Sequence, residues 1–152
     1  MEYTFIYPNQ LFEIHPAVSR SRKIILIEDP LFFGDDKYPI NYHNQKILLH
    51  HMSIRRYFHK MRNNGYTIEI INYANLKREH YTGWLIKKYN IHTIHVSDVV
   101  DYELKNRIEK AVVDCSASLK WYDNPNFLLK QSDVNNDFLG KKRHLMANFY
   151  KK

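Results

Sequence analysis

The sequence predicts an α/β domain built on a five-stranded parallel sheet with helices on both of its faces, a doubly wound, Rossmann-like architecture. Short runs rich in β-branched and aromatic residues alternate with longer stretches of helical spacing, which is the pattern of β-α-β units. The run Ile24-Ile25-Leu26-Ile27 has no polar alternation, as expected of a strand covered on both faces. We expect residues 1–122 to form this domain and residues 123–152 to form a linker and C-terminal segment.

Five segments have the composition of strands, and each is followed by turn or cap residues. They are residues 3–7, 23–27, 66–71, 91–96 and 118–121. Residues 9–22, between the first two, are expected to be mostly loop, with at most one helical turn after Pro16. The first strand ends at Pro8, which cannot donate to a sheet ladder.

The longest helix is predicted for residues 43–63, after a loop at 29–42 that contains Pro30, Gly34 and Pro39. Five residues at steps of four, three, four and three define its buried face: Ile47, His51, Ile54, Phe58 and Met61. The pair Asn64-Gly65 ends this helix, because glycine readily takes the left-handed cap conformation.

Two further helices are predicted, the first of them from a weaker signal. Residues 76–89 have helical spacing interrupted by Gly83. Asp98 or Asp101 is placed to cap a helix whose apolar residues recur at helical spacing up to Cys115. After Trp121 the composition changes: residues 123–126 have turn chemistry, residues 132–137 are polar, and residues 141–152 can form a short helix.

Composition restricts the class of protein. No run of 18 uncharged apolar residues is present, and the start Met1-Glu2-Tyr3 lacks the basic and apolar regions of a signal peptide, so we expect a cytoplasmic protein that does not enter a membrane. The single cysteine, Cys115, can form no internal disulfide and cannot hold an iron–sulfur cluster. The net charge of +7 favours anionic partners such as DNA, although a solvated basic surface explains the charge equally simply.

No familiar catalytic motif is present. The four glycines, at Gly34, Gly65, Gly83 and Gly140, are too scattered for a dinucleotide fingerprint or a phosphate-binding loop, and no Gly-x-Ser-x-Gly elbow exists. The nine histidines do not have the spacing of metal ligands. We therefore expect no catalytic residue and no metal site in the chain.

The strand ends are the most informative positions for a binding site, because ligands of open parallel sheets lie beyond the carboxyl ends of the strands. Asn9 and Gln10 follow the first strand, Glu28 ends the second, and Phe32 comes shortly after it. Amide and carboxylate groups can hydrogen-bond the edge of a flat heteroaromatic ligand while an aromatic ring stacks on its face. The alternative is that these residues only organise turns and fill the core.

Several segments resemble one family. His43-Asn44-Gln45-Lys46-Ile47, with Met52 and Arg55 later in the same helix, is similar to a motif of the deoxyribodipyrimidine photolyase-related proteins, the bacterial photolyases and cryptochromes that carry an iron–sulfur cluster. Pro8-Asn9-Gln10-Leu11 resembles their Gly-Asp-Gln-Leu, with Asn9 in place of the acidic residue. The segments 123–128 and 138–150 resemble their linker, with Ala147 in place of a glutamate.

The resemblance implies the N-terminal α/β domain of such a protein, with strand order 3-2-1-4-5 and a crevice between the first and fourth strands. In relatives this domain holds an antenna chromophore, and by resemblance Asn9, Gln10, Glu28 and Phe32 lie where 6,7-dimethyl-8-ribityllumazine or a flavin would bind, weakly in the isolated domain. The relatives are DNA photolyases, which are lyases. Their helical domain, with FAD, the iron–sulfur cluster and the lesion-binding groove, would follow residue 152, so we expect no FAD and no DNA-repair activity in this chain alone.

Three functions remain open from the sequence. The first is a stand-alone or truncated antenna domain that binds a chromophore. The second is a non-catalytic module that binds nucleic acid or protein, including a separate helical photolyase domain, and has lost the chromophore site. The third is an unrelated enzyme on a similar sheet. The apolar residues of 138–150 also suggest a homodimer or a fold-back through the C-terminal segment.

Overall fold

The computed structural model describes residues 1–76, 80–138 and 140, and it contains a five-stranded sheet in the order β3-β2-β1-β4-β5. All four strand pairs are parallel, so the predicted fold class and strand order are confirmed. The strands are β1 (Glu2–Ile6), β2 (Lys23–Ile27), β3 (Ile68–Ile71), β4 (Thr93–Ser97) and β5 (Ser118–Tyr122). They match the predicted segments, with most boundaries shifted by one or two residues.

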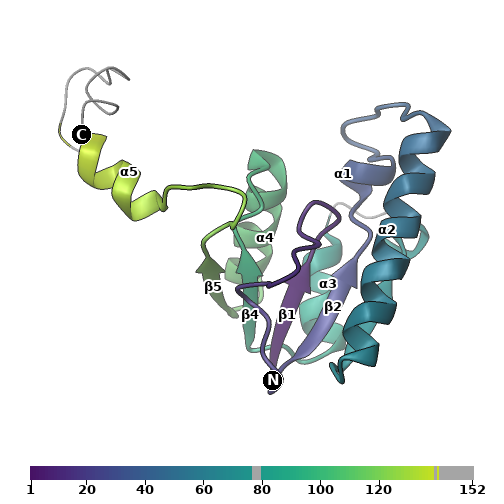
Figure 1. Cartoon of the computed structure of the whole chain (residues 1–152), viewed down its shortest axis with the longest axis horizontal. Coiled ribbons are helices and arrows are strands. Elements are labelled where there is room, and N and C mark those ends of the chain that lie inside the picture. The colour runs from purple at the N-terminus through teal and green to yellow at the C-terminus, as the bar shows by residue number, and fades with distance from the viewer. Residues whose placement is uncertain (77–79, 139, 141–152) are drawn as a thin grey trace.

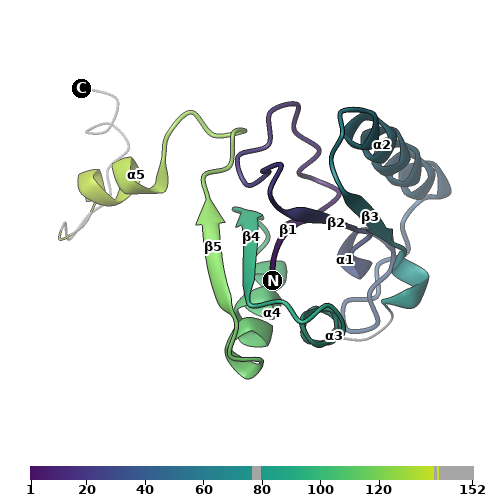
Figure 2. The same cartoon turned by 90° about the horizontal axis from the view of Figure 1, so that it is seen from below.

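Helices cover the two faces of the sheet. They are α1 (Pro30–Phe33), α2 (Asn44–Asn63), the 3-10 turn η1 (Tyr73–Asn75), α3 (Tyr81–Lys88), α4 (Tyr102–Asp114) and α5 (Gln131–Phe138). Figure 2 shows α2 on one side of the sheet and α3 and α4 on the other, while Figure 1 shows α5 apart from the sheet. Within the described residues, none of the helices combines the length and hydropathy that crossing a bilayer requires.

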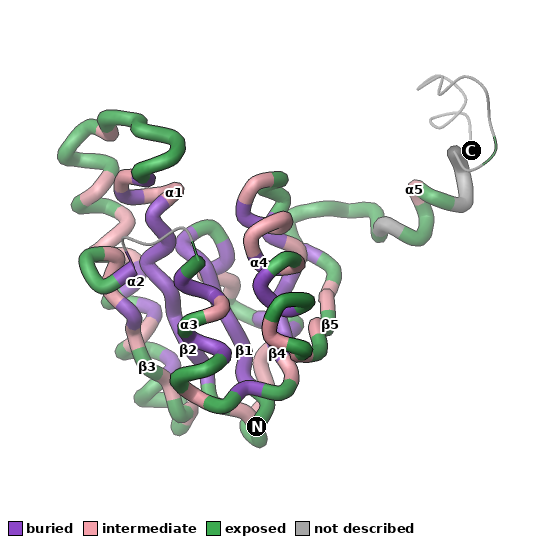
Figure 3. Tube along the Cα trace, turned by 180° about the vertical axis from the view of Figure 1, so that it is seen from behind, coloured by how far each residue is buried: buried purple, intermediate pink, exposed green. Residues whose placement is uncertain are grey.

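Alternate residues of the central strands supply two cores. On the α3 and α4 side, Phe5 and Ile25 pack with Leu85 and Ile108. On the α2 side, Ile6, Ile24 and Leu26 pack with Ile54, Tyr57 and Met61 of α2. Burial of both strand faces explains why β2 reads as a continuous apolar run. Figure 3 shows the buried strands running through the middle of the domain.

The connection from β1 to β2 contains no helix, so the turn expected after Pro16 is not helical. This loop lies on the same side of the sheet as α2 (Figure 2). The Thr4 hydroxyl and the Arg22 guanidinium both donate to the carbonyl oxygen of Ala17, each at 2.9 Å. One hydrogen bond from β1 and one from the residue just before β2 therefore hold the loop on this side of the sheet.

Two expectations for local structure were wrong, and one further helix was not predicted. The region predicted as loop at 29–42 contains α1, because Asp29 accepts from the Leu31 amide as N-cap and Pro30 occupies the first helical position. The helix expected from residue 76 begins only at Tyr81. Residues 132–137, which the sequence marked only as polar, lie in α5. In each case the local capping signal was weak or was outweighed by composition.

The two best-marked helices are confirmed. α2 begins after His43, whose ring accepts from the Gln45 amide, and it ends before Gly65, which has φ +82°. α4 begins after Asp101, whose carboxylate accepts from the Leu104 amide at 2.8 Å. The sequence left Asp98 and Asp101 open as caps, and the structure selects Asp101. The helix considered for residues 141–152 lies outside the described residues.

Candidate functional site

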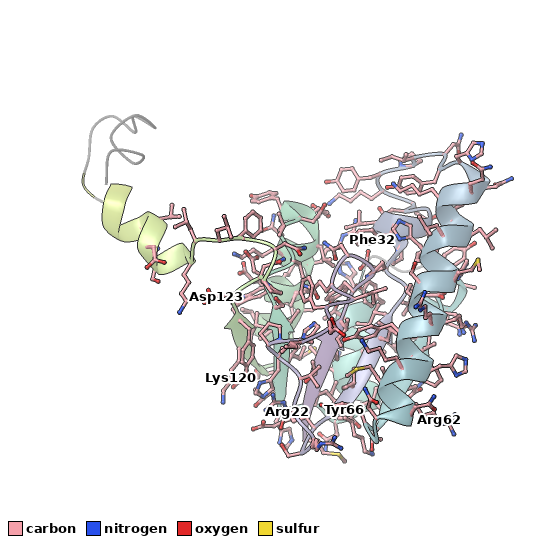
Figure 4. The ribbon with its side chains drawn as sticks, viewed as in Figure 1. Arg22, Phe32, Arg62, Tyr66, Lys120 and Asp123 are labelled. Atoms are coloured by element: carbon pink, nitrogen blue, oxygen red, sulfur yellow. The ribbon has the colours of Figure 1, made fainter. Side chains whose placement is uncertain are left out.

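The four residues predicted to line a pocket all lie beyond the carboxyl ends of β1 and β2. Asn9 and Gln10 follow β1, Glu28 directly follows β2, and Phe32 lies in α1. Figure 4 shows Phe32 beside the first half of α2. Their hydrogen-bond partners divide them into two groups, because Asn9 and Gln10 bond to the end of β4 whereas Glu28 bonds to α2 and η1.

Gln10 is fully buried and uses both ends of its amide. Its Nε2 donates to the carbonyl oxygens of Ser97 at 2.7 Å and Asp98 at 3.2 Å, and its Oε1 accepts from the Tyr7 amide at 3.4 Å. Asn9 is exposed, and its Nδ2 donates to the carbonyl oxygen of Val99 at 3.2 Å. The two amides therefore join the end of β1 to the end of β4, at the point where the strand order reverses.

Glu28 is also fully buried, and both of its carboxylate oxygens are engaged. Oε1 lies 2.9 Å from Nδ1 of His51, and Oε2 accepts from the Tyr73 amide at 3.2 Å. The His51 side chain is 35% exposed, whereas the Glu28 side chain is completely covered. A ligand approaching from solvent would therefore meet His51 before it met the carboxylate.

Aromatic rings surround this hydrogen-bonded pair. Phe33 stacks on Tyr73, with ring centroids 5.4 Å apart, and lies 4.7 Å from the His51 ring. Phe32 is half-buried and meets His50 edge-on at 5.9 Å. Burial lowers the pKa of His50, and the nearby Lys46 lowers it further, which favours a neutral ring there. We call Glu28, His51, Phe32, Phe33 and Tyr73 the Glu28 cluster.

The sequence identified only part of this cluster. His51 was assigned to the buried face of the long helix by its spacing, but nothing in that spacing indicated a carboxylate partner. Tyr73 contributes its backbone amide and the face of its ring from a 3-10 turn that was not predicted. The contact of Glu28 with His51 joins residues 23 positions apart, so only the tertiary fold reveals it.

A second buried polar group lies beneath the same edge. Asp29 is fully buried and accepts hydrogen bonds from the Tyr81 hydroxyl and the Leu31 amide. Burial raises its pKa to about 6, against the opposing effect of those hydrogen bonds. The neighbouring Tyr7 hydroxyl is buried and makes no well-formed hydrogen bond to any described residue. From the sequence, Asp29 was expected only to begin the loop at 29–42.

A groove of about 900 Å³ lies farther along the edge, beside α4 and β5. Tyr102, Trp121 and Phe127 are among its lining residues, and Val100 at its rim has φ +64°. The apolar residues Leu128 and Leu129 that follow β5 are exposed. The expected contacts of Leu139, Leu145, Met146, Phe149 and Tyr150 lie outside the described residues.

Comparison with known proteins accounts for nearly the whole chain. Residues 4–152 match the model of the family described as deoxyribodipyrimidine photo-lyase-related protein. The chain is also similar to the uncharacterized protein R852 of Acanthamoeba polyphaga mimivirus, with 25% identity over 148 residues that cover 95% of this chain and 74% of the viral protein. The family match extends across the sheet, the Glu28 cluster and the C-terminal segment, and the chain therefore belongs to the deoxyribodipyrimidine photolyase-related protein family.

Proposed function

We propose that this chain is a non-catalytic α/β domain that binds a flat heteroaromatic chromophore, a ribityl-lumazine or a flavin, at the Glu28 cluster. The observation that carries the proposal is the pair formed by buried Glu28 and partly exposed His51 beside aromatic rings. The antenna domain that the sequence resemblance implies supports the choice of ligand class. The proposal gives the domain a light-harvesting or chromophore-binding role and no bond-breaking step.

The His51 ring and the Phe32 side chain of the Glu28 cluster have groups that can contact such a ligand. When the His51 ring is neutral, its Nδ1 carries the proton donated to Glu28, so Nε2 is left as an acceptor. Lumazines and flavins present an imide N–H that can donate to such a nitrogen. Phe32 offers a partly exposed ring for stacking. Glu28 is then a positioning residue that fixes the His51 tautomer, rather than a direct contact of the ligand.

Asn9 and Gln10 have different parts in this proposal. Gln10 has no free hydrogen-bonding hydrogen directed away from Ser97 and Asp98, so we assign it to the wall of the site and not to the ligand. Asn9 is exposed, and its side-chain oxygen has no hydrogen-bond partner among the described residues. That oxygen is available to a ribityl hydroxyl at the rim.

A fluorescence titration with 6,7-dimethyl-8-ribityllumazine, FMN and FAD tests the proposal. We expect saturable binding of at least one of them, with a dissociation constant on the order of micromolar. His51→Phe and Phe32→Ala should each weaken binding by about tenfold, because each removes one anchoring contact. His92→Phe is the matched control, since His92 is exposed and lies just before β4. No saturable change with any ligand, in protein shown to be folded by circular dichroism, would contradict the proposal.

The buried side chains of Gln10 and Glu28 favour a second function. Gln10 and Glu28 already bond to groups of their own chain, as residues do when they serve the fold and no ligand. In that case the domain is a module that binds nucleic acid or another protein and has lost the chromophore site. The titration separates the two functions, because this second function requires wild-type protein and the His51→Phe variant to give the same flat response.

A further inference from the structure

The outward face of α2 has a composition that its role in the fold does not explain. The helix buries Ile54, Tyr57 and Met61 against the sheet. Its first half also exposes three large apolar side chains, Leu48 (58% exposed), Leu49 (64%) and Met52 (62%). At 100° per residue these three fall within one 100° arc on the side opposite the buried residues. Figure 1 shows α2 at one end of the domain, and because Ile54, Tyr57 and Met61 pack against the sheet, the opposite side of the helix faces away from it.

The second half of the same outward side is cationic. Its exposed basic residues are Arg55, Arg56, His59, Lys60 and Arg62. Between Asn44 and Asn63 the helix has five Lys and Arg residues and no Asp or Glu. Compensation from elsewhere is slight: Lys60 pairs with exposed Glu13 at 3.3 Å, and Arg55 contacts the neutral side chain of Asn72. We call the eight exposed residues Leu48, Leu49, Met52, Arg55, Arg56, His59, Lys60 and Arg62 the α2 surface.

We propose that the α2 surface is a docking site for an acidic amphipathic helix of a protein partner. An apolar half beside a cationic half matches a helix that carries apolar residues at one end and carboxylates at the other. The exposed apolar residues lie at spacings of one, three and four, which is the spacing of helix-to-helix packing. The proposal concerns a different part of the domain from the Glu28 cluster and stands whether or not a chromophore binds.

Charge and side-chain chemistry argue against two other occupants. A second copy of this chain would bring four Lys and Arg residues, and no Asp or Glu, of its own α2 surface to the interface, so like charges would face one another. Nucleic acid would satisfy the cationic half but would leave Leu48, Leu49 and Met52 unused, because the α2 surface presents no Phe, Tyr or Trp on which bases could stack.

The direction of the partner helix follows from helix dipoles. Carboxylates are favoured in the first turns of a helix, and the basic half of the α2 surface lies toward the C-terminal end of α2. A partner that carries its acidic residues near its N-terminus and its apolar residues near its C-terminus therefore fits α2 in the antiparallel direction. In this antiparallel direction, the opposite order of the two halves would place the acidic residues against Leu48 and Leu49.

Fluorescence anisotropy with a synthetic peptide tests the proposal. The probe is a labelled 20-residue helical peptide with glutamates in its N-terminal half and leucines at helical spacing in its C-terminal half. The matched control is a peptide of identical composition with the glutamates in the C-terminal half. We expect saturable binding of the first peptide, weakened about tenfold by the double change Leu48→Ser and Met52→Ser and about tenfold by Arg56→Glu. Lys110→Glu, an exposed residue of α4, should leave the affinity unchanged.

Each contrary outcome is distinct. Failure of the first peptide to bind, or equal affinity for both peptides, would overturn the proposal. So would tighter binding of a 20-nucleotide poly-dT strand that displaces the peptide, since it would identify the surface as a nucleic-acid site. If the free protein dimerises, and if Leu48→Ser and Met52→Ser abolish the dimer, the surface is an interface with a second copy instead. All substitutions are at exposed positions, so thermal melts of the variants should match that of the wild-type protein.

Discussion

Gln10 and Ser97 are 87 residues apart in the sequence and are joined by a 2.7 Å hydrogen bond from the side-chain amide to the backbone carbonyl. The same Nε2 reaches the carbonyl oxygen of Asp98, which also accepts from Asn124. The bond lies between the ends of β1 and β4, where the order of strands reverses and where open sheets of this class bind ligands. A side chain that closes this point stabilises the sheet and at the same time shapes the candidate site.

Replacing Gln10 by alanine should lower the free energy of unfolding by about 2–3 kcal/mol. The change leaves the buried Ser97 carbonyl without its side-chain donor and opens a small cavity. Urea titration measures the loss. The control is Gln45→Ala, because Gln45 is an exposed residue at the start of α2. If both variants lose the same stability, Gln10 does not have the structural role described above.

The predictability of the fold and that of the site differ for a physical reason. The alternation of apolar strand segments and helical spacing reports on burial, which acts on every residue of an element, and it predicted the parallel sheet. The strand order was implied by the family resemblance. The pairing of Glu28 with His51 depends on one contact between β2 and α2, and no periodicity encodes it. Asn9, Gln10, Glu28 and Phe32 were placed correctly at strand ends, but their partners could not be identified without the fold.

Asp29→Asn should change how stability depends on pH. Burial raises the pKa of Asp29 to about 6 in the folded protein, above its ordinary value of 3.8, so the folded state binds this proton more tightly than the unfolded state. The contribution of Asp29 is therefore fully present below pH 3.8 and is lost as the pH rises to about 6. Asparagine resembles the protonated carboxyl, so the variant should gain about 2–3 kcal/mol relative to wild type between pH 4 and pH 7. Urea titrations at both pH values measure it, and a constant difference would contradict it.

His15→Asn should produce the opposite pH dependence. Burial lowers the pKa of His15 to about 4 from its ordinary 6.5, so the unfolded state binds this proton more tightly. The wild-type protein thus loses stability from this group as the pH falls from 6.5 to 4. Asparagine can retain the acceptor for the Ala17 amide, which His15 Nδ1 contacts at 3.2 Å, and it does not titrate.

The His15→Asn variant should therefore gain about 2–3 kcal/mol relative to wild type between pH 7 and pH 4. Because this slope opposes that of Asp29, the wild-type profile alone conceals both contributions, and only the two difference profiles separate them. A His15→Asn difference that stays flat, or that grows toward neutral pH, would show that the ring is not held neutral by burial.

Arg107→Met should separate the loop after α1 from α4. The Arg107 guanidinium lies 2.6 Å and 3.1 Å from the two carboxylate oxygens of Asp35, and its Nε donates to Glu103 at 2.9 Å. Both members of the Arg107–Asp35 pair are buried, with side chains 7% and 6% exposed. Removing the guanidinium leaves a buried carboxylate without its counter-charge, and we expect a loss of about 3 kcal/mol at pH 7.

A double-mutant cycle distinguishes this ion pair from simple packing. Arg107 holds the pKa of Asp35 below its ordinary value, so Asp35→Asn added to Arg107→Met should recover part of the lost stability by removing the unpaired charge. The amides of Lys37 and Tyr38, which both donate to Asp35 at 3.0 Å, should exchange hydrogen faster in Arg107→Met. Arg56→Met, at an exposed position of α2, should change neither quantity. If the double variant is as unstable as the sum of the single variants, the stability lost in Arg107→Met comes from packing of its side chain, because a charge pair would have made the two changes non-additive.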